Sequence, residues 1–163
     1  MIIELEKYFN VEGSHEDFDF SFQPEYPLSD DFESTGQISF SGSISNSAGL
    51  VNLTGKATFT AEIVCSRCAE TFEKEFVTGI EHQLVSELND EDNDVFLLIE
   101  DMQLDLDSLI CEDIILSLPY VFLCREDCKG ICSQCGKNLN EGPCNCKKAA
   151  DPRMAALLQL LDE

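Results

Sequence analysis

The chain has 163 residues, an ordinary apolar fraction of 44%, a formal charge of −22, nine cysteines and only two histidines. This length suits one domain, or one domain with a small appendage. No apolar run approaches the roughly 20 residues of a membrane helix, and the sequence MIIELEKYFN at the N-terminus lacks the apolar region of a signal peptide. We therefore expect a cytoplasmic protein with reduced cysteines, whose odd number favours metal or thiol chemistry over disulfides.

The negative charge is concentrated in the first three quarters of the chain. Residues 1–123 hold four basic and 26 acidic residues and so carry the whole formal charge of −22, whereas residues 124–163 hold six of each kind. The phosphates of a nucleic acid would repel such an acidic segment. We predict two parts, namely an acidic β-rich body with a helix over 1–123 and a zinc-binding, cysteine-rich tail with a terminal helix over 124–163.

Four segments of the body alternate apolar and polar residues, which is typical of half-buried strands. They are 18–22, 37–47, 50–64 and 70–85, and in the third the alternation is interrupted near Gly55. The turn sequence Asn-Ser-Ala-Gly separates the second segment from the third. Because the last three segments follow one another closely, they predict an antiparallel meander.

The periodicity becomes that of a helix after the acidic loop NDEDND. In LDLDSLICEDIILSLPY (104–120) apolar residues recur at helical spacing, Asp105 or Asp107 can cap the start, and Pro119 ends the helix. Cys111 lies on this helix, where we interpret it as a buried packing residue rather than a metal ligand.

The last segment, DPRMAALLQLLDE (151–163), predicts a short docking helix. Asp151 can cap it, Pro152 suits its first position, and its leucines form an apolar face. Together the segments predict an α+β fold. It consists of an antiparallel β meander or barrel-like sheet with a packed helix, followed by a C-terminal zinc-binding loop and a short helix.

Six cysteines fall in the stretch CREDCKGICSQCGKNLNEGPCNC (124–146), which has almost no apolar residues. Cys132 and Cys135 form a CxxC pair that can aim two thiolates at one tetrahedral ion, and Gly136 follows where the turn needs a positive φ. The pair that completes the ligand set is either Cys144 with Cys146 or Cys124 with Cys128. We predict a closed, structural Zn²⁺ site that organises a tail unfolded without metal.

A second CxxC, Cys65 with Cys68, lies at the end of a predicted hairpin. It is a redox dithiol, a contributor to a metal site with the tail cysteines, or a turn with free thiols and an exposed Arg67 that contacts a partner. The redox interpretation is disfavoured because thioredoxin-like motifs start a helix in a βαβ unit and because the surroundings are acidic. The two histidines, His15 and His82, are expected on the surface.

Four stretches of the sequence are distinctive in combination, namely VCSRCAETF, EDIILSLPYVFLC, the cysteine stretch 124–146 and DPRMAALLQLL. Taken together, they resemble the bacterial YceD family of large-subunit ribosomal RNA accumulation proteins. The resemblance implies a cytoplasmic, non-enzymatic factor, required for accumulation of 23S ribosomal RNA, of the cysteine-rich version described as metal-binding. Cys65, Arg67 and Cys68 fall on the family's central motif, and Asp113, Leu118 and Pro119 fall on its helix-and-proline segment.

Charge directs the prediction of a partner. An acidic body is a poor ligand for bare RNA, because Lys and Arg must neutralise the phosphates. Direct contact with ribosomal RNA is therefore disfavoured, and a basic ribosomal or ribosome-assembly protein is the expected partner. We expect no enzymatic activity, no membrane contact and no small-molecule substrate. The alternative is a thiol redox protein or sensor that uses the CxxC motifs, while a transcription regulator is disfavoured by the single basic residue in the terminal segment.

Overall fold

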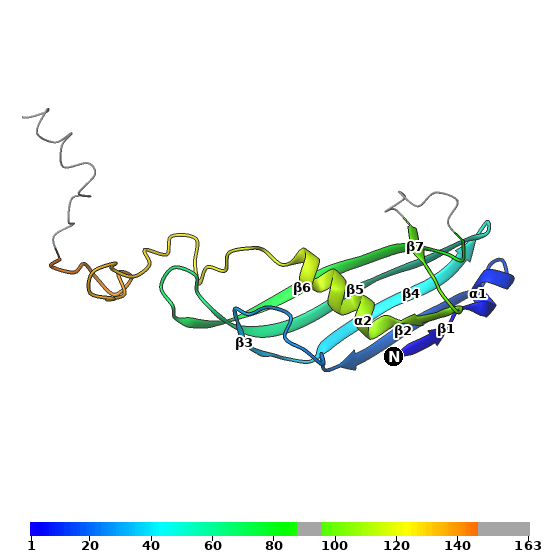
Figure 1. The fold of residues 1–163 in the computed structure, drawn as a ribbon, viewed down its shortest axis with the longest axis horizontal. Helices are drawn as coiled ribbons and strands as arrows, with labels where there is room; N and C mark the ends of the chain where they lie inside the picture. The colour runs from blue at the N-terminus through cyan, green and yellow to red at the C-terminus, as the bar shows by residue number, and fades with distance from the viewer. Residues whose placement is uncertain (88–95, 147–163) are drawn as a thin grey trace, which may run out of the picture.

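The computed structural model describes residues 1–87 and 96–146 (Figure 1). The predicted terminal helix over 151–163 and the acidic loop 89–94 lie outside these residues. The elements are β1 (Ile2–Glu4), α1 (Glu6–Asn10), β2 (His15–Phe22), β3 (Phe32–Thr35), β4 (Ile38–Ser47), β5 (Leu50–Val64), β6 (Thr71–Val85), β7 (Phe96–Leu98), β8 (Gln103–Asp105) and α2 (Leu106–Ser117). Neither helix in these ranges is long and apolar enough to cross a membrane.

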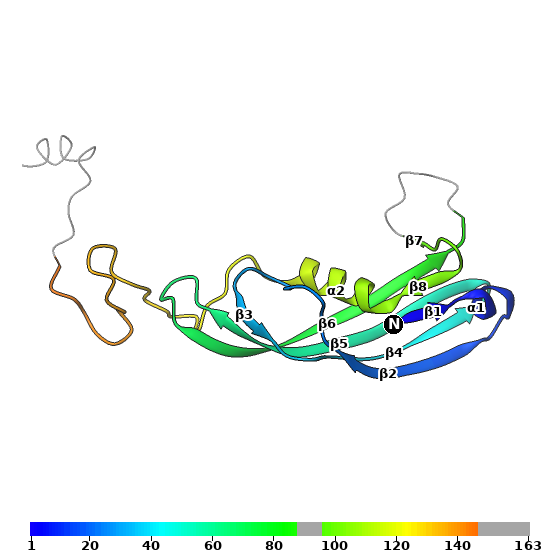
Figure 2. The ribbon, with the colours of Figure 1, turned by 60° about the horizontal axis from the view of Figure 1, so that its bottom comes forward.

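One curled sheet forms most of the protein (Figure 2). Its strands lie in the order β2-β4-β5-β6-β7, and β3 pairs with β5 beside this path. The pairs are antiparallel except β6 with β7, which run parallel, and β1 and β8 form a second, two-stranded antiparallel sheet. The described residues are therefore mostly β, and the predicted meander is β4-β5-β6 with a helix packed on it.

The strand β5 keeps its alternation throughout, including at Gly55. Every second residue from Val51 to Ile63 is buried, except that Gly55 is half-buried. An added Cβ at Gly55 would lie 2.6 Å from Cζ of Phe40, so the ring of Phe40 fills the inner space at this position. The apparent interruption in the sequence pattern is thus a close approach of an aromatic ring to the backbone.

The helix α2 lies along the inner face of the sheet (Figure 2). It begins after Asp105 and ends before the Leu118-Pro119 pair, as predicted. Its buried residues are Leu106, Leu109, Ile110, Cys111 and Ile114. Cys111 is 3% exposed and belongs to the main hydrophobic core, which confirms its interpretation as a packing residue.

His82 lies between β6 and α2, and its predicted place on the surface is wrong. It shares the inner face of β6 with the buried Ile80 and Leu84, and its side chain is 25% exposed. Its Nε2 lies 2.7 Å from Oδ2 of Asp113 on α2. This contact helps to hold α2 against β6.

Candidate metal centres

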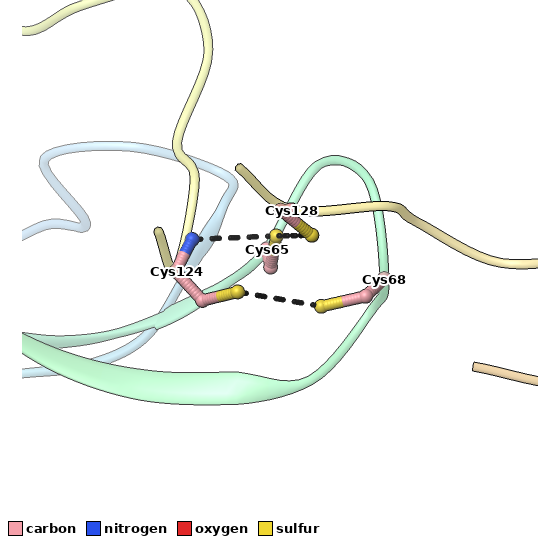
Figure 3. A group of neighbouring side chains, drawn as sticks. All are labelled: Cys65, Cys68, Cys124 and Cys128. Carbon is pink, nitrogen blue, oxygen red and sulfur yellow. Dashed lines mark hydrogen bonds between the residues drawn. The ribbon is translucent and has the colours of Figure 1, made fainter. Parts of the chain in front are cut away.

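The CSRC turn joins β5 to β6 at the tip of the longest hairpin. The N–H of Cys65 donates to the carbonyl of Glu70 at 2.9 Å, and the N–H of Ala69 donates to the carbonyl of Cys65 at 2.9 Å. Ala69 has a φ of 58°, which closes the turn tightly. As a result, the thiols of Cys65 and Cys68 both face the chain that follows α2 (Figure 3).

The segment after α2 returns to this turn because Phe122 anchors it. The side chain of Phe122 is 3% exposed, and its ring packs edge-on against Phe32 and Phe76 with centroid distances of 5.4 and 6.1 Å. Its carbonyl accepts a hydrogen bond from the N–H of Ser66 at 2.8 Å, and its own N–H donates to Ser66 Oγ at 3.1 Å. These contacts place Cys124, two residues further on, beside the CSRC turn.

Four cysteines from two distant parts of the chain meet here. The first cysteine group comprises Cys65, Cys68, Cys124 and Cys128. Their Sγ atoms all lie within 4.8 Å of one another, with Cys65 to Cys128 at 3.8 Å and Cys68 to Cys124 at 3.6 Å (Figure 3). Sulfurs bound at about 2.3 Å to a tetrahedral ion lie about 3.8 Å apart, whereas a disulfide bond measures about 2.05 Å. The spacing is that of a metal site.

A second cysteine group lies within the tail alone. It comprises Cys132, Cys135, Cys144 and Cys146, whose Sγ atoms also lie within 4.8 Å of one another. The N–H of Gly136 donates to the carbonyl of Cys132 at 2.8 Å, and Gly136 has the positive φ, 70°, that the sequence predicted. None of these four cysteines is buried, whereas three of the first group are. The second cysteine group is therefore a surface site.

The two groups favour partly ionised thiols. Burial raises the pKa of the Cys65 thiol, but backbone N–H groups, chiefly that of Cys124, outweigh it and lower this pKa to about 6. The pKa of Cys132 also falls to about 6, mainly because the N–H of Cys135 faces its sulfur. In contrast, the Cys135 thiol, with burial, raises the pKa of Cys146 to about 12. Four adjacent thiols cannot all ionise alone, and a divalent cation bound between them would supply the missing positive charge.

The structure distributes the candidate ligands over two groups where the sequence suggested one site in the tail. Cys144 and Cys146 lie beside Cys132 and Cys135, and Cys124 and Cys128 lie beside Cys65 and Cys68. The two closing pairs considered from the sequence thus lie in different groups. The signal available in the sequence was that eight of the nine cysteines form four closely spaced pairs, and a tetrahedral ion takes two pairs.

Arg67 connects the CSRC turn to the tail. It is exposed, but its guanidinium donates to the carbonyl of Cys128 at 3.1 Å, and its own carbonyl accepts from the N–H of Ile131 at 3.0 Å. Gly130 has a φ of 73°, and an added Cβ there would lie 2.9 Å from the carbonyl oxygen of Arg67. Sequence reasoning gave Gly130 no role, because neither its positive φ nor its close approach to Arg67 can be read from the sequence pattern.

Replacing Gly130 with alanine is expected to loosen the tail from the CSRC turn. The left-handed conformation costs alanine about 1–2 kcal/mol, and the overlap with the Arg67 carbonyl adds about 1–3 kcal/mol. Gly49→Ala is the matched control, because Gly49 has a φ of 83° and no described atom lies within 4 Å of an added Cβ. Thermal denaturation should show the larger loss for Gly130→Ala, and equal losses would contradict the close approach.

Known proteins resemble parts of this chain. Uncharacterized proteins of Mycobacterium bovis and Mycobacterium tuberculosis are 38% identical to it over 63 residues, and one of Mycobacterium leprae is 33% identical over the same length. The match covers 39% of this chain and 29–30% of those relatives, so it spans less than a third of their length. No solved structure matches the chain significantly.

A family model covers both cysteine groups. It is described as "Large ribosomal RNA subunit accumulation protein YceD" and matches residues 53–161. This range contains the CSRC turn, α2 and all eight cysteines of the two groups. The match extends over more than half of the chain, and the chain therefore belongs to the YceD family of large ribosomal RNA subunit accumulation proteins.

Proposed function

We propose that this protein is a non-enzymatic, zinc-stabilised factor that supports accumulation of 23S ribosomal RNA and biogenesis of the large ribosomal subunit. The observation that carries the proposal is the family membership over residues 53–161. The factor acts in the cytoplasm, where bacterial ribosomes assemble. The factor acts by binding another macromolecule, and its metal ions stabilise the structure of the segments that make this contact.

Zinc is the ion that we assign to both cysteine groups. Four thiolates are a common ligand set of structural zinc sites, and all positions of the tetrahedral ion are then filled by protein. A closed site leaves no position for water or a substrate. The ions would therefore stabilise the fold, and each site would carry a net charge of about −2.

The partner is proposed from the charge of the sheet. Along the outer face of β6, Glu73, Glu75 and Glu81 are exposed, and Asp17 and Asp19 are exposed on the same face of β2. This surface repels the phosphates of RNA, which bind through Lys and Arg. It attracts a basic protein and speeds their encounter at low salt. We therefore propose a basic ribosomal or ribosome-assembly protein as the partner.

An exposed apolar segment, 116–121, comprises the last two residues of α2 and the chain that leads from it toward the first cysteine group. In it Leu116 is 84% exposed, Tyr120 103% and Val121 56%. Large apolar side chains exposed together often mark a protein contact. Glu112, one helical turn before Leu116, is also exposed, so the segment borders acidic surface. We propose that it contacts apolar side chains of the same basic partner.

Replacing both Leu116 and Tyr120 with serine should weaken binding of the partner at least about tenfold, because exposed anchors dominate such contacts. The melting temperature should stay unchanged, since both side chains are exposed. Val11→Ser is the matched control, because Val11 is 55% exposed at the end of α1, outside both the acidic outer face and segment 116–121. Calorimetric titration with a ribosomal protein that binds the wild type measures the effect, and equal affinities would exclude the segment from the contact.

The partner class is tested with the metal-loaded, full-length protein. We expect it to bind purified basic proteins of the large subunit more weakly as salt rises, and not to bind fragments of 23S RNA. Tight, salt-sensitive binding to naked RNA with none to protein would contradict the partner. In cells, removing the protein should lower the ratio of 23S to 16S RNA, and an unchanged ratio would contradict the proposed function. Elemental analysis should find zinc rather than iron.

A thiol redox protein or sensor is the second candidate. The low pKa of Cys65 and of Cys132, about 6 in each case, favours it, because the thiolate is the reactive form. Alkylation followed by mass spectrometry separates the two functions. Metal-bound thiols should react only after a chelator is added, whereas a redox pair should react, or be found oxidised, in the untreated protein.

A further inference from the structure

Asn140 connects the two cysteine groups directly. It lies in the loop between Cys135 and Cys144, which belong to the second group. Its Nδ2 donates to Cys128 Sγ, in the first group, at 3.4 Å. Its Oδ1 accepts from the N–H of Lys129 at 2.8 Å. One side chain from the loop of the second group therefore touches a ligand of the first.

The linker between the groups is short and held on both sides. Three residues separate Cys128 from Cys132. The carbonyl of Gly130 accepts from the N–H of Leu139 at 2.8 Å, and the N–H of Ile131 donates to the carbonyl of Arg67 at 3.0 Å. The linker thus pairs with the second group's loop on one side and with the CSRC turn on the other, so neither group can move freely relative to the other.

The loop that carries Asn140 depends on the second group for its position. Ile131 and the neighbouring tail residues bury little apolar surface, and Ile131 is 46% exposed. A metal ion that joins Cys132 and Cys135 to Cys144 and Cys146 closes this loop and removes the entropy that its free ends would keep. The donor of Asn140 is then already in place beside Cys128 when the first group takes up its ion.

We propose that the two cysteine groups bind metal cooperatively. Asn140 is the positioning residue through which a metal ion in the second group raises the metal affinity of the first. An N–H donor beside a thiolate ligand stabilises the ligand and orients it, and loss of such a partner typically lowers metal affinity about 10–100-fold. Coupling between two binding sites is reciprocal, so an ion in the first group strengthens binding in the second by the same factor. The inference rests on the proposed metal binding and goes beyond the proposed function.

The affinity of each group is measured with full-length protein by Co²⁺ absorption and by Zn²⁺ competition against a chromophoric chelator. Cys144→Ser with Cys146→Ser disables the second group, and we expect the first group then to bind about tenfold more weakly. Asn140→Ala alone should weaken the first group by a similar factor. Combined with the two serine changes, it should add little, because the donor is already displaced.

Three further proteins make the test specific. Asn140→Asp keeps the acceptor for the Lys129 N–H but replaces the donor, and it should weaken the first group at least as much as Asn140→Ala. Glu141→Gln changes an exposed side chain of the same loop and should leave both affinities unchanged. In a background where Cys65 and Cys68 are serine, Asn140→Ala should leave the second group's affinity unchanged, which a general loss of structure would not do.

The results separate this inference from the proposed function. Two ions bound independently, or an Asn140→Ala protein whose first group binds as tightly as the wild type, would overturn the coupling and leave the zinc-stabilised factor intact. A wild-type protein that takes up neither Co²⁺ nor Zn²⁺ would overturn both. Additive losses of the first group's metal affinity from Asn140→Ala and the two serine changes would also overturn the coupling, because independent effects add.

Discussion

Replacing Cys65 with serine is expected to remove one metal ion and much of the protein's stability. Cys65 is 2% exposed and is one of four ligand candidates that join the β5–β6 hairpin to the segment after α2. An ion bound only by the folded state stabilises it by about 4 kcal/mol when its free concentration is 1,000 times Kd. We expect the zinc content to fall from two ions to one per chain, with a lower denaturation midpoint.

Cys111 provides the matched control for this variant. It is also buried, at 3% exposed, but it packs in the hydrophobic core and lies in neither cysteine group. Cys111→Ala should keep both ions and cost about 1–2 kcal/mol of packing. Elemental analysis with urea denaturation measures both effects. An unchanged zinc content in Cys65→Ser, or a loss of metal from Cys111→Ala as well, would contradict the assignment of the first cysteine group.

Removing the metal with a chelator should unfold the described tail but not the sheet. Buried hydrophobic residues in the described chain end at Cys128, so little apolar burial holds residues 129–146. Their backbone hydrogen bonds include those from Cys132 N–H to the Lys137 carbonyl at 2.9 Å and from Leu139 N–H to the Gly130 carbonyl at 2.8 Å. Without an ion, neither metal ligation nor a hydrophobic core supports these hydrogen bonds. Segments of this kind fold only with metal.

Hydrogen exchange measured before and after chelation tests this expectation. Amides of 129–146 should lose their protection, whereas those of β4 and β5 should keep it, because the core beneath these strands contains no metal ligand. The zinc-loaded protein supplies the reference for each amide. Simultaneous loss of protection in sheet and tail, or full protection of the tail without metal, would contradict the division of roles.

Local periodicity was enough to place the long elements. The alternation over 37–47, 50–64 and 70–85 corresponds to β4, β5 and β6 within one residue at each end. This prediction succeeds because successive side chains of a strand point to opposite faces, so burial of one face produces an alternating pattern of apolar and polar residues in the sequence. The helix before Pro119 follows in the same way from helical spacing and from the steric demand of proline.

Contacts between distant segments could not be read in this way. Cys65 and Cys128 are 63 positions apart in the chain, and Cys68 and Cys124 are 56 positions apart, yet the sulfurs of each pair lie close together. Their meeting depends on the length of the β5–β6 hairpin and on the docking of Phe122. His82 was misplaced for a related reason, since a polar residue on the inner face is recognisable only when its partner on α2 is known.

By itself, the sequence determined the antiparallel strands, the helix, the acidic body and the CxxC turn with its glycine, because each depends on neighbouring residues or on composition. Tertiary structure alone decided that the CSRC turn shares a cysteine group with Cys124 and Cys128, and that Gly130 and Asn140 join this group to the second. A ligand set drawn from two distant segments is defined by how those segments pack in space, and packing of that kind leaves no periodic trace in a single chain.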